Sequence, residues 1–408
     1  MTSMTSRPQF GDGRPSVAVV AYTEYPWDPR VRREAEALAE AGYVVHVIAV
    51  RPSSGPSPTH LNGVHIHEVP LATRRGSKAR YVYQYGVFLA MSTAVLARLH
   101  RRSALDLVHV HSLPDFQVLA AIPVKLQGVP ILLDLHEAMP EILAARFRLG
   151  PHSLWVRVAS LVEAACARFS DHVIVANDAI RRTIVSRGIP AGKVTTVYNA
   201  SDPAASVPTG DQVRRELGLP EGRYLVHAGG INPERDLETL LAALARLPSQ
   251  ADLQLVVAGE GESAYKEGLV ELSNRLGIRD RVHFVGRMSR ERSLALMSLA
   301  ELGVVTLEAN PLTHLAWPTR VPEFVQLGKL LIVPRLKFLR ETLGEGARYY
   351  APGDPDSLSR EISAALGRDA ARDATVTEAE QVIRRFDWSH MRDLLLRVVR
   401  ALEGSHVG

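Results

Sequence analysis

The chain has 408 residues, of which 46% are hydrophobic and 23% are charged, and its formal net charge is +4. These proportions are those of a soluble globular protein. The length excludes a single ordinary core, so we expect two domains of about 200 residues each. The mild positive charge fits a protein that binds phosphates or anionic lipid, and it fits an ordinary solvated surface equally well.

The single cysteine, Cys166, excludes an intramolecular disulfide and lies in an apolar helical pattern, where we expect a buried thiol. Residues 1–14 lack the apolar centre of a signal peptide, and we interpret them as a disordered leader. Residues 81–99 are interrupted by Gln84 and Arg98, so no membrane span is predicted. We therefore expect a cytoplasmic protein.

A basic stretch precedes this segment, with Arg74, Arg75, Lys78 and Arg80 followed by three tyrosines. Such a pattern resembles a membrane-surface patch, and a solvated helix start explains it as well. Peripheral contact with the inner membrane face therefore stays open. No feature beyond this cluster favours nucleic acid, so no nucleic-acid partner is expected.

Short β-branched runs alternate with helical patterns in the first half, which is typical of βαβ units around a parallel sheet. The expected strands are residues 17–22, 44–50, 64–69, 107–111, 131–135, 172–176 and 194–198. The expected helices are residues 30–41, 78–101 and 115–127, one ending at residue 169 and one ending at residue 187.

Residues 201–210 are rich in turn formers and predict an interdomain linker. A second alternating series follows. Its expected strands are residues 224–228, 253–258, 282–285, 303–307, 330–333 and 348–351. Its expected helices are residues 236–246, 264–276, 321–327, 355–366 and 389–402.

The pattern predicts an α/β protein with two Rossmann-like, doubly wound parallel-sheet domains that face a central cleft. The domains span residues 15–200 and 211–385, and a helix in 386–408 crosses back to the first domain. Ligands of such sheets bind at the carboxyl ends of the strands.

Two glycine-rich turns follow strands of the second half. Gly229 and Gly230 precede a helix that begins near Asp236, and Arg235 could pair with a diphosphate there. A strand-to-helix turn with a surface arginine explains the same residues. The later turn Gly259-Glu260-Gly261 is a weak form of the dinucleotide fingerprint, and its position argues against NAD.

The segment from Pro318 to Phe324 carries more information. Pro318 and Thr319 open a helix whose first turn presents Arg320 and Glu323 on one face. The carboxylate could accept both hydroxyls of a ribose while the arginine faces phosphates. An intrahelical ion pair is the alternative.

In the first half, His109 and His111 end a strand and share one face. They could orient a sugar hydroxyl or form a metal pair, but no third ligand follows at convincing spacing. His136 and Glu137 lack the second histidine of a zinc-protease helix, so we expect neither a metal nor a cofactor.

Two further positions have a functional and a structural interpretation. Asp28 and Arg30 lie in a loop stiffened by two prolines, which suits acceptor recognition, and a helix cap also explains Asp28. Asp354 and Asp356 imitate a metal-binding D-x-D, but capping is the better interpretation at this loop-to-helix junction.

In combination these motifs resemble the retaining family-4 glycosyltransferases of the GT-B fold over nearly the whole chain. The resemblance rests on the following runs: DPRVRREAxxLAxxGYxV (28–45), VHVH (108–111), DLHE (134–137), VYNASD (197–202), GGINPERD (229–236), AGEGE (258–262), RVxFxG (281–286), PTRVPEFxxLGK (318–329) and APGDPDSL (351–358).

The resemblance implies transfer of a hexose-type sugar from a nucleotide-diphosphate sugar to an acceptor hydroxyl, with retention and without a metal. The acceptor, whether glycan, lipid-linked sugar or small molecule, is left open. A nucleotide-sugar 2-epimerase of the same fold and a non-catalytic nucleotide-sugar-binding protein are the alternatives.

The resemblance also implies roles for individual residues. His111 resembles the cleft histidine near the transferred sugar, Arg235 and Arg320 stand where the family has a basic pair on the diphosphate, and Glu323 matches the ribose-binding glutamate. Residues 286–288 (Gly286, Arg287, Met288) resemble the turn that meets the nucleobase. The chain departs from the family at Leu315, where the first glutamate of the E-x7-E motif is absent, as it also is in relatives with a P-T-K-x-x-E variant.

Overall fold

The computed structural model describes residues 13–52, 58–71, 78–200, 209–248, 252–367 and 370–404. The chain divides into two compact units. Unit 1 comprises residues 1–199 and 389–408, and unit 2 comprises residues 200–388. Residues 1–12 of the expected leader, residues 201–208 of the expected linker (201–210) and the basic residues Arg74 and Arg75 lie outside the described residues.

Unit 1 is built on an eight-stranded sheet in the order β3-β4-β2-β1-β5-β6-β7-β8, in which only β3 is antiparallel. Its strands are β1 (Ser16–Ala21), β2 (Val44–Val50), β3 (His60–Leu61), β4 (Val64–Val69), β5 (Leu107–His111), β6 (Ile131–Leu135), β7 (His172–Val175) and β8 (Val194–Thr196). Its α-helices are α1 (Pro29–Glu40), α2 (Lys78–Arg102), α3 (Ile122–Lys125), α4 (Met139–Phe147), α5 (Leu154–Phe169), α6 (Asp178–Ser186) and α15 (Trp388–Gly404).

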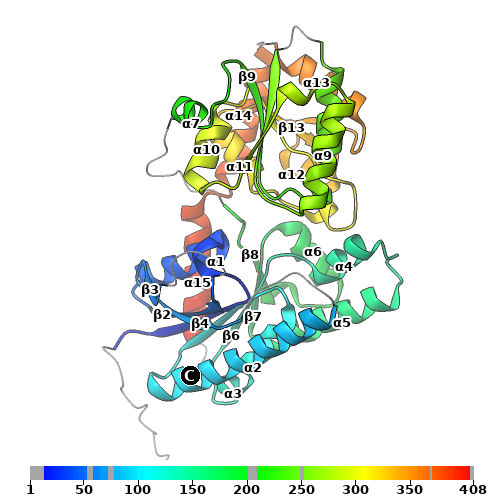
Figure 1. The fold of residues 1–408 in the computed structure, drawn as a ribbon. Helices are drawn as coiled ribbons and strands as arrows, with labels where there is room; N and C mark the ends of the chain where they lie inside the picture. The colour runs from blue at the N-terminus through cyan, green and yellow to red at the C-terminus, as the bar shows by residue number, and fades with distance from the viewer. Residues whose placement is uncertain are drawn as a thin grey trace, which may run out of the picture. The chain divides into compact units, whose positions relative to one another are not determined.

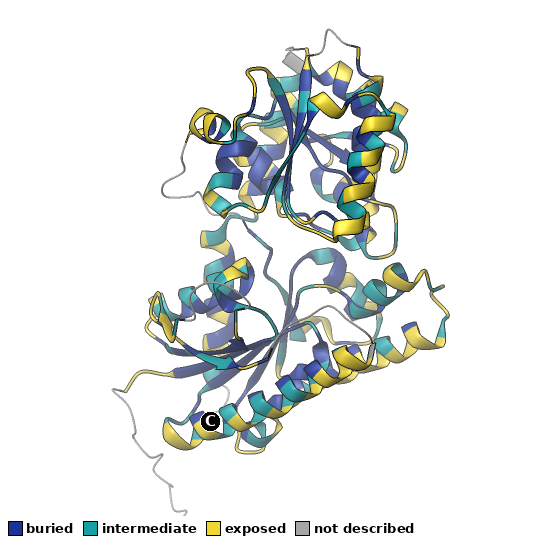
Figure 2. Ribbon diagram, in the orientation of Figure 1, coloured by how far each residue is buried: buried dark blue, intermediate teal, exposed yellow. Residues whose placement is uncertain are grey.

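Both faces of this sheet are covered (Figure 1), with α1 and α15 on one face and α2 and α3 on the other. The central strands β1, β5 and β6 are buried along their length (Figure 2), as expected for a parallel sheet between helices. Side chains alternate between the faces, so Val108 and Val110 join the core beneath α2, and His109 and His111 point to the α1 face.

Helix α2 contacts this core through a stripe that recurs about every fourth residue. Phe88, Leu96 and Leu99 are buried in it. Residues 79–102 nevertheless reach the length and hydropathy of a membrane span, with 28% of the window buried, which by itself is weak evidence. The prediction that this segment does not span a membrane stays a prediction.

Unit 2 contains two three-stranded parallel sheets, β11-β10-β9 and β12-β13-β14. Backbone pairing between Tyr224 and Ala300 brings β9 beside β12. The strands are β9 (Arg223–Ala228), β10 (Leu253–Ala258), β11 (Val282–Gly286), β12 (Gly303–Val304), β13 (Leu331–Pro334) and β14 (Arg348–Tyr350). The α-helices are α7 (Gly210–Glu216), α8 (Leu237–Arg246), α9 (Ser263–Arg275), α10 (Arg290–Ser298), α11 (Arg320–Gln326), α12 (Lys337–Leu343), α13 (Pro355–Ala365) and α14 (Ala370–Arg384). Helices α10, α11 and α14 lie on one side of these strands and α9 and α13 on the other (Figure 1).

The structure corrects several expected elements. The helix expected over residues 115–127 is a 3₁₀ turn (Asp115–Ala121) followed by the short α3, because Pro123 has no N–H to continue a regular ladder. The strand expected over 303–307 ends at Val304. Helices α7, α10, α12 and α14 were not expected, since short or weakly periodic segments give little amphipathic signal.

Candidate functional site

The expected site residues fall into two groups, one in each unit. In unit 2, Arg320 lies against the turn that follows β9: a Cβ atom on Gly229 would stand 4.0 Å from Arg320 Nε and 3.9 Å from His227 Nε2. Arg235 ends the 3₁₀ turn (Pro233–Arg235) before α8, and its carbonyl oxygen accepts a hydrogen bond of 2.6 Å from Thr306. The turn after β9 therefore has Arg320 beside it, and Arg235 follows six residues after Gly229 in the chain, just before α8.

His227 lies at the same turn, close to the two arginines. The pKa of His227 is lowered to about 4, mainly by burial and further by the positive charges of Arg235 and Arg320. The ring is therefore neutral at physiological pH. A charged group whose field reaches one imidazole also reaches an anion bound in the same position. The sequence analysis did not single out His227, although it lies near the carboxyl end of β9, two residues before Gly229, and that position could have identified it.

Arg320 and Glu323 form the expected pair across the first turn of α11, with Arg320 Nη1 donating to Glu323 Oε2. Glu323 is buried, and its other oxygen lies 3.9 Å from Arg290 Nε. The Arg320 side chain keeps 29% of its surface exposed. The ion-pair interpretation of this spacing is therefore confirmed.

The two glycine turns pack against each other. A Cβ atom on Gly259 would stand 1.7 Å from the carbonyl oxygen of Gly229, and one on Gly261 would stand 1.7 Å from that of Ile231. The amides of Gly229 and Ile231 donate to the carbonyls of Ala258 and Glu260, which extends the parallel ladder beyond the strands. Backbone packing alone thus requires glycine at 259 and 261, and the donor role predicted for Gly259, Glu260 and Gly261 stays a prediction.

The remaining unit 2 residues lie at neighbouring strand and helix ends. Residues 286–288 follow β11, where Arg287 is exposed. Pro318 is buried and Thr319 is exposed at the start of α11. Leu315 ends a 3₁₀ turn and is half-buried. Asp354 caps α13 by accepting hydrogen bonds from the amides of Asp356 and Ser357, which confirms the capping interpretation.

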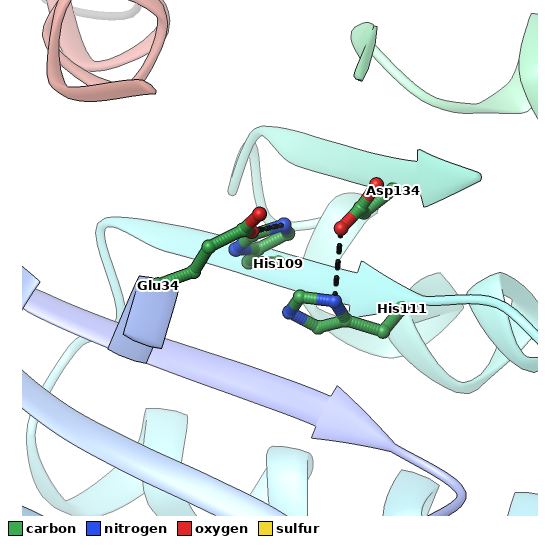
Figure 3. Close-up of side chains that lie close together, drawn as sticks. All are labelled: Glu34, His109, His111 and Asp134. Atoms are coloured by element: carbon green, nitrogen blue, oxygen red, sulfur yellow. Dashed lines mark ion pairs between the residues drawn. The ribbon is translucent and has the colours of Figure 1, made fainter. Parts of the chain in front are cut away.

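In unit 1 a compact polar cluster lies between α1 and the sheet (Figure 3). His109 and His111 come from β5, Asp134 from the adjacent β6 and Glu34 from α1. One ligand atom of each residue lies within 4.8 Å of the others. His109 Nε2 is 3.6 Å from Glu34, and His111 Nδ1 is 3.1 Å from Asp134. Elements distant in sequence thus bring two carboxylates beside the two histidines.

Arg30 anchors this cluster. Its Nε and Nη2 donate to the two oxygens of Asp134 over 2.7 and 2.8 Å, and Nη1 donates to the Val197 carbonyl and to Asn199 Oδ1. Asp28 caps α1 by accepting from the amides of Arg30 and Val31. Both side chains are therefore used within the protein, and their predicted role at an acceptor stays a prediction.

Burial sets the protonation states in this cluster. It raises the pKa of Glu34 to about 8 against the opposing charge of Arg30, and together with His111 it lowers the pKa of His109 well below its usual range. Burial would raise the pKa of Asp134 too, but Arg30 and the histidines beside it hold it well below its usual range. A buried Arg30–Asp134 ion pair thus stands beside a neutral His109.

His111 and His136 differ in access to solvent. His111 is 1% exposed, whereas the His136 side chain is 21% exposed, and the two rings meet through His111 Nδ1 and His136 Nε2 at 3.0 Å. Glu137 beside them is exposed. A ligand that approaches this end of β6 therefore meets His136 first, with His111 behind it.

Comparison with known proteins places both units in described families. Residues 28–200 match the model described as Glycosyl transferase 4-like domain, and residues 211–382 match the model described as Glycosyl transferases group 1. The chain is 25% identical over 310 residues to N-acetyl-alpha-D-glucosaminyl L-malate synthase of Bacillus anthracis, which covers 71% of this chain and 75% of the relative. It is 27% identical over 294 residues to alpha-D-kanosaminyltransferase of Streptomyces kanamyceticus, which covers 67% of this chain and 74% of the relative.

Solved structures show the same fold. Sucrose-phosphate synthase from Thermosynechococcus elongatus superposes with a TM-score of 0.77 at 20% identity, over 96% of this chain and all of that one. HepE of Anabaena in complex with UDP-glucose superposes with a TM-score of 0.73 at 16% identity, over 95% of this chain and 99% of that one. The prediction of two Rossmann-like parallel-sheet domains is confirmed.

Proposed function

Because this chain is a glycosyltransferase of the GT-B type, with a glycosyl transferase 4-like domain followed by a glycosyl transferases group 1 domain, we propose that it uses a nucleotide-diphosphate sugar. In this proposal it moves a hexose-type sugar to an acceptor hydroxyl, with retention. The position of Arg320 beside Gly229, together with the effect of both Arg235 and Arg320 on the neighbouring His227, carries the proposal. Two guanidinium groups at the carboxyl end of a parallel sheet suit a diphosphate, which they can bind through paired hydrogen bonds.

The arginines supply the charge that the leaving group needs. As the bond between the sugar and the diphosphate breaks, negative charge grows on the diphosphate, and preorganised cations stabilise it without reorganisation. Arg235 and Arg320 take this task in the proposal, so no metal is needed at the diphosphate. No carboxylate stands out as a covalent nucleophile, so the acceptor hydroxyl attacks from the face that the leaving group vacates.

Glu323 has a second task in this scheme. Its carboxylate pairs with Arg320, whose side chain is partly exposed. When Arg320 turns to the diphosphate, a carboxylate oxygen becomes available to accept the ribose hydroxyls. Glu323 therefore holds Arg320 in place before binding and contacts the donor afterwards.

In unit 1, the proposal assigns the sugar contact to His136 and gives His111 a positioning role. The different exposures of the two rings support this order. His111 acts through its contact with His136 and through Asp134, which both rings approach within 3.2 Å. A His111→Asn variant should therefore change the pH profile and kcat more than the KM for the donor.

The test begins with thermal shifts against a panel of nucleotides and nucleotide sugars, since a ligand of the native state raises Tm by mass action. Donor turnover is then followed with and without candidate acceptors for the wild type, Arg235→Ala and Arg320→Ala. Transfer with kcat/KM reduced by orders of magnitude in both variants is the expected result. Wild-type turnover in both variants would refute the site.

The same assay separates the two alternatives. Conversion of the donor sugar without any acceptor would indicate a 2-epimerase, and binding without transfer would indicate a non-catalytic protein. The relatives reported above are a synthase and a transferase, which favours neither alternative.

We also propose that unit 1 contacts an anionic membrane through α5. Leu154, Trp155 and Leu161 on this helix are 69%, 65% and 70% exposed, at spacings that share one face. The flanking exposed cations are Arg146, Arg148, Arg157 and Arg168. Both acidic residues of the α4–α5 pair, Glu141 and Glu163, bind Arg187. An apolar stripe with unopposed cations suits anionic lipid, and Figure 2 shows the exposed face along this helix.

A further inference from the structure

Three residues of the unit 1 cluster hold buried polar atoms that no described group satisfies. They are both carboxylate oxygens of Glu34, both ring nitrogens of His109, and Nε2 of His111, and none has a hydrogen-bond partner among the residues that the structure describes. All three side chains are 1% exposed or less. A buried polar group without a partner destabilises the folded state, so a set on three adjacent side chains indicates a missing partner.

The arrangement follows from two periodicities. His109 and His111 are two residues apart on β5 and so share the face beneath α1, with ring centroids 4.2 Å apart. Glu34 lies one turn after Arg30 on α1 and reaches this face from the helix side. Figure 3 shows the carboxylate and the rings pointing toward one another.

The partners of His111 fix which of its nitrogens is available. Nδ1 lies 3.1 Å from Asp134 Oδ2 and 3.0 Å from His136 Nε2. In the tautomer that the proposal uses, an N–H on Nδ1 donates to the Asp134 carboxylate, which can only accept, and a lone pair is left on the buried Nε2. Asp134 is held in turn by two hydrogen bonds from Arg30. A carboxylate that orients a histidine in this way is the usual outer partner of a metal-binding imidazole.

We propose that Glu34, His109 and His111 bind a divalent transition-metal ion of the zinc class, with Asp134 orienting His111. Two imidazoles and one carboxylate are a common ligand set for such ions, and the coordination is completed by water or by a second oxygen. Zinc bonds of about 2.0–2.2 Å at tetrahedral angles separate ligand atoms by roughly 3.4 Å. The separation of 3.6 Å between His109 Nε2 and Glu34 Oε2 fits this value.

Arg30 does not occupy the proposed site. Its Nε, Nη1 and Nη2 are directed to Asp134, Val197 and Asn199, and its approach to Glu34 at 3.2 Å forms an ion pair without a hydrogen bond. The bound ion ties α1 to β5 and fixes the ring of His111 behind His136. It has no part in neutralising the diphosphate, so the inference does not depend on the proposed donor.

Metal content of the full chain tests the proposal. Protein stripped with a chelator is loaded with Zn²⁺ or Co²⁺ and desalted, and bound metal is measured by mass spectrometry. A second histidine group, on β2–β4, could retain metal on its own. The ring centroid of His65 lies 5.1 Å from that of His60 and 5.2 Å from that of His46, and the ring of His67 lies 5.2 Å from that of His46. The reference protein is therefore a His60→Gln/His65→Gln variant, and His109→Gln is made in that background.

The reference protein should retain about one ion per chain, and His109→Gln should retain none. Because a buried variant can fail to fold, two measurements use the reference protein alone. Zn²⁺ should raise its Tm, and bound Co²⁺ should show the intense visible bands of four- or five-coordinate nitrogen and oxygen ligation. No retained metal in the reference protein, or equal retention in a folded His109→Gln variant, would overturn the proposal and leave buried water as the missing partner.

Discussion

Replacement of Arg320 by alanine tests the donor site most directly. Its Nε stands 4.0 Å from the Cβ position of Gly229, at the turn where the proposal places the diphosphate. Two unit charges about 4 Å apart interact by about 4 kcal/mol at an effective dielectric constant of about 20. The side chain is 29% exposed, and solvent screening reduces this value. We expect a net loss of about 2–3 kcal/mol, or about 100-fold in Kd.

The assay is titration calorimetry with the nucleoside diphosphate that gives the largest thermal shift. Arg320→Lys keeps the charge but loses the planar fork, and it should lose about 10-fold. Arg275→Ala, which removes an arginine paired only loosely with Glu271 at 3.9 Å on α9, serves as the control and should bind as the wild type does.

A second readout needs no ligand. If Arg235 and Arg320 create the field that lowers the pKa of His227 to about 4, removing either arginine should raise that pKa, and Arg235→Ala should raise it more. NMR titration of ring-labelled histidine, assigned with a His227→Gln variant, measures the change. Unchanged nucleotide affinity together with an unchanged His227 pKa in Arg320→Ala would refute the reasoning.

Three further predictions concern unit 1. Burial, and to a smaller extent the charge of Glu163, raises the pKa of Asp115 to about 8. The folded state therefore keeps a proton that the unfolded chain loses above about pH 4. The free energy of unfolding should then fall by about 1.4 kcal/mol per pH unit between about pH 4 and pH 8. In denaturant titrations at pH 5–8, Asp115→Asn should remove this fall. The control Asp393→Asn, at an exposed position on α15, should keep it. Equal pH dependence of unfolding for Asp115→Asn and the wild type would contradict the assignment. Burial and neighbouring histidines lower the pKa of His46 to about 4, so the stability that this neutral ring contributes above about pH 6.5 is lost as the pH falls toward 4. His46→Gln should reduce this loss of unfolding free energy by about 1 kcal/mol, after allowance for the partial exposure of the ring. An unchanged loss of stability between pH 6.5 and pH 4 in His46→Gln would contradict the prediction. Trp155→Ser with Leu161→Ser should weaken cosedimentation with anionic vesicles and leave nucleotide binding intact, and undiminished cosedimentation would exclude α5 as the docking face.

Much of the fold could be predicted from local patterns. Short β-branched runs identified the strands of the three sheets other than β3, and long amphipathic runs such as those of α1, α8 and α9 identified helices. Errors occurred where local patterns are weak. A proline divides the segment after β5, and α7, α10 and α12 are too short to show a clear period.

Some features of the candidate site also follow from local spacing in the sequence, and others do not. The pairing of Arg320 with Glu323 and the capping by Asp28 and Asp354 follow from spacing within one turn, so the sequence sufficed for them. The contact of Arg320 with the Gly229 turn, by contrast, needs the order of strands, because the two residues belong to distant segments.

The buried cluster of unit 1 depends most on tertiary structure. The sequence by itself determined that His109 and His111 share a face of one strand and that Arg30 and Glu34 share a face of one helix, because local backbone geometry sets both periods. Only the packing of α1 on β5, with β6 adjacent, brings Glu34 to His109 and joins Arg30 to Asp134 across 104 residues of sequence. Contacts between distant segments depend on which elements pack together, and no local period encodes that choice.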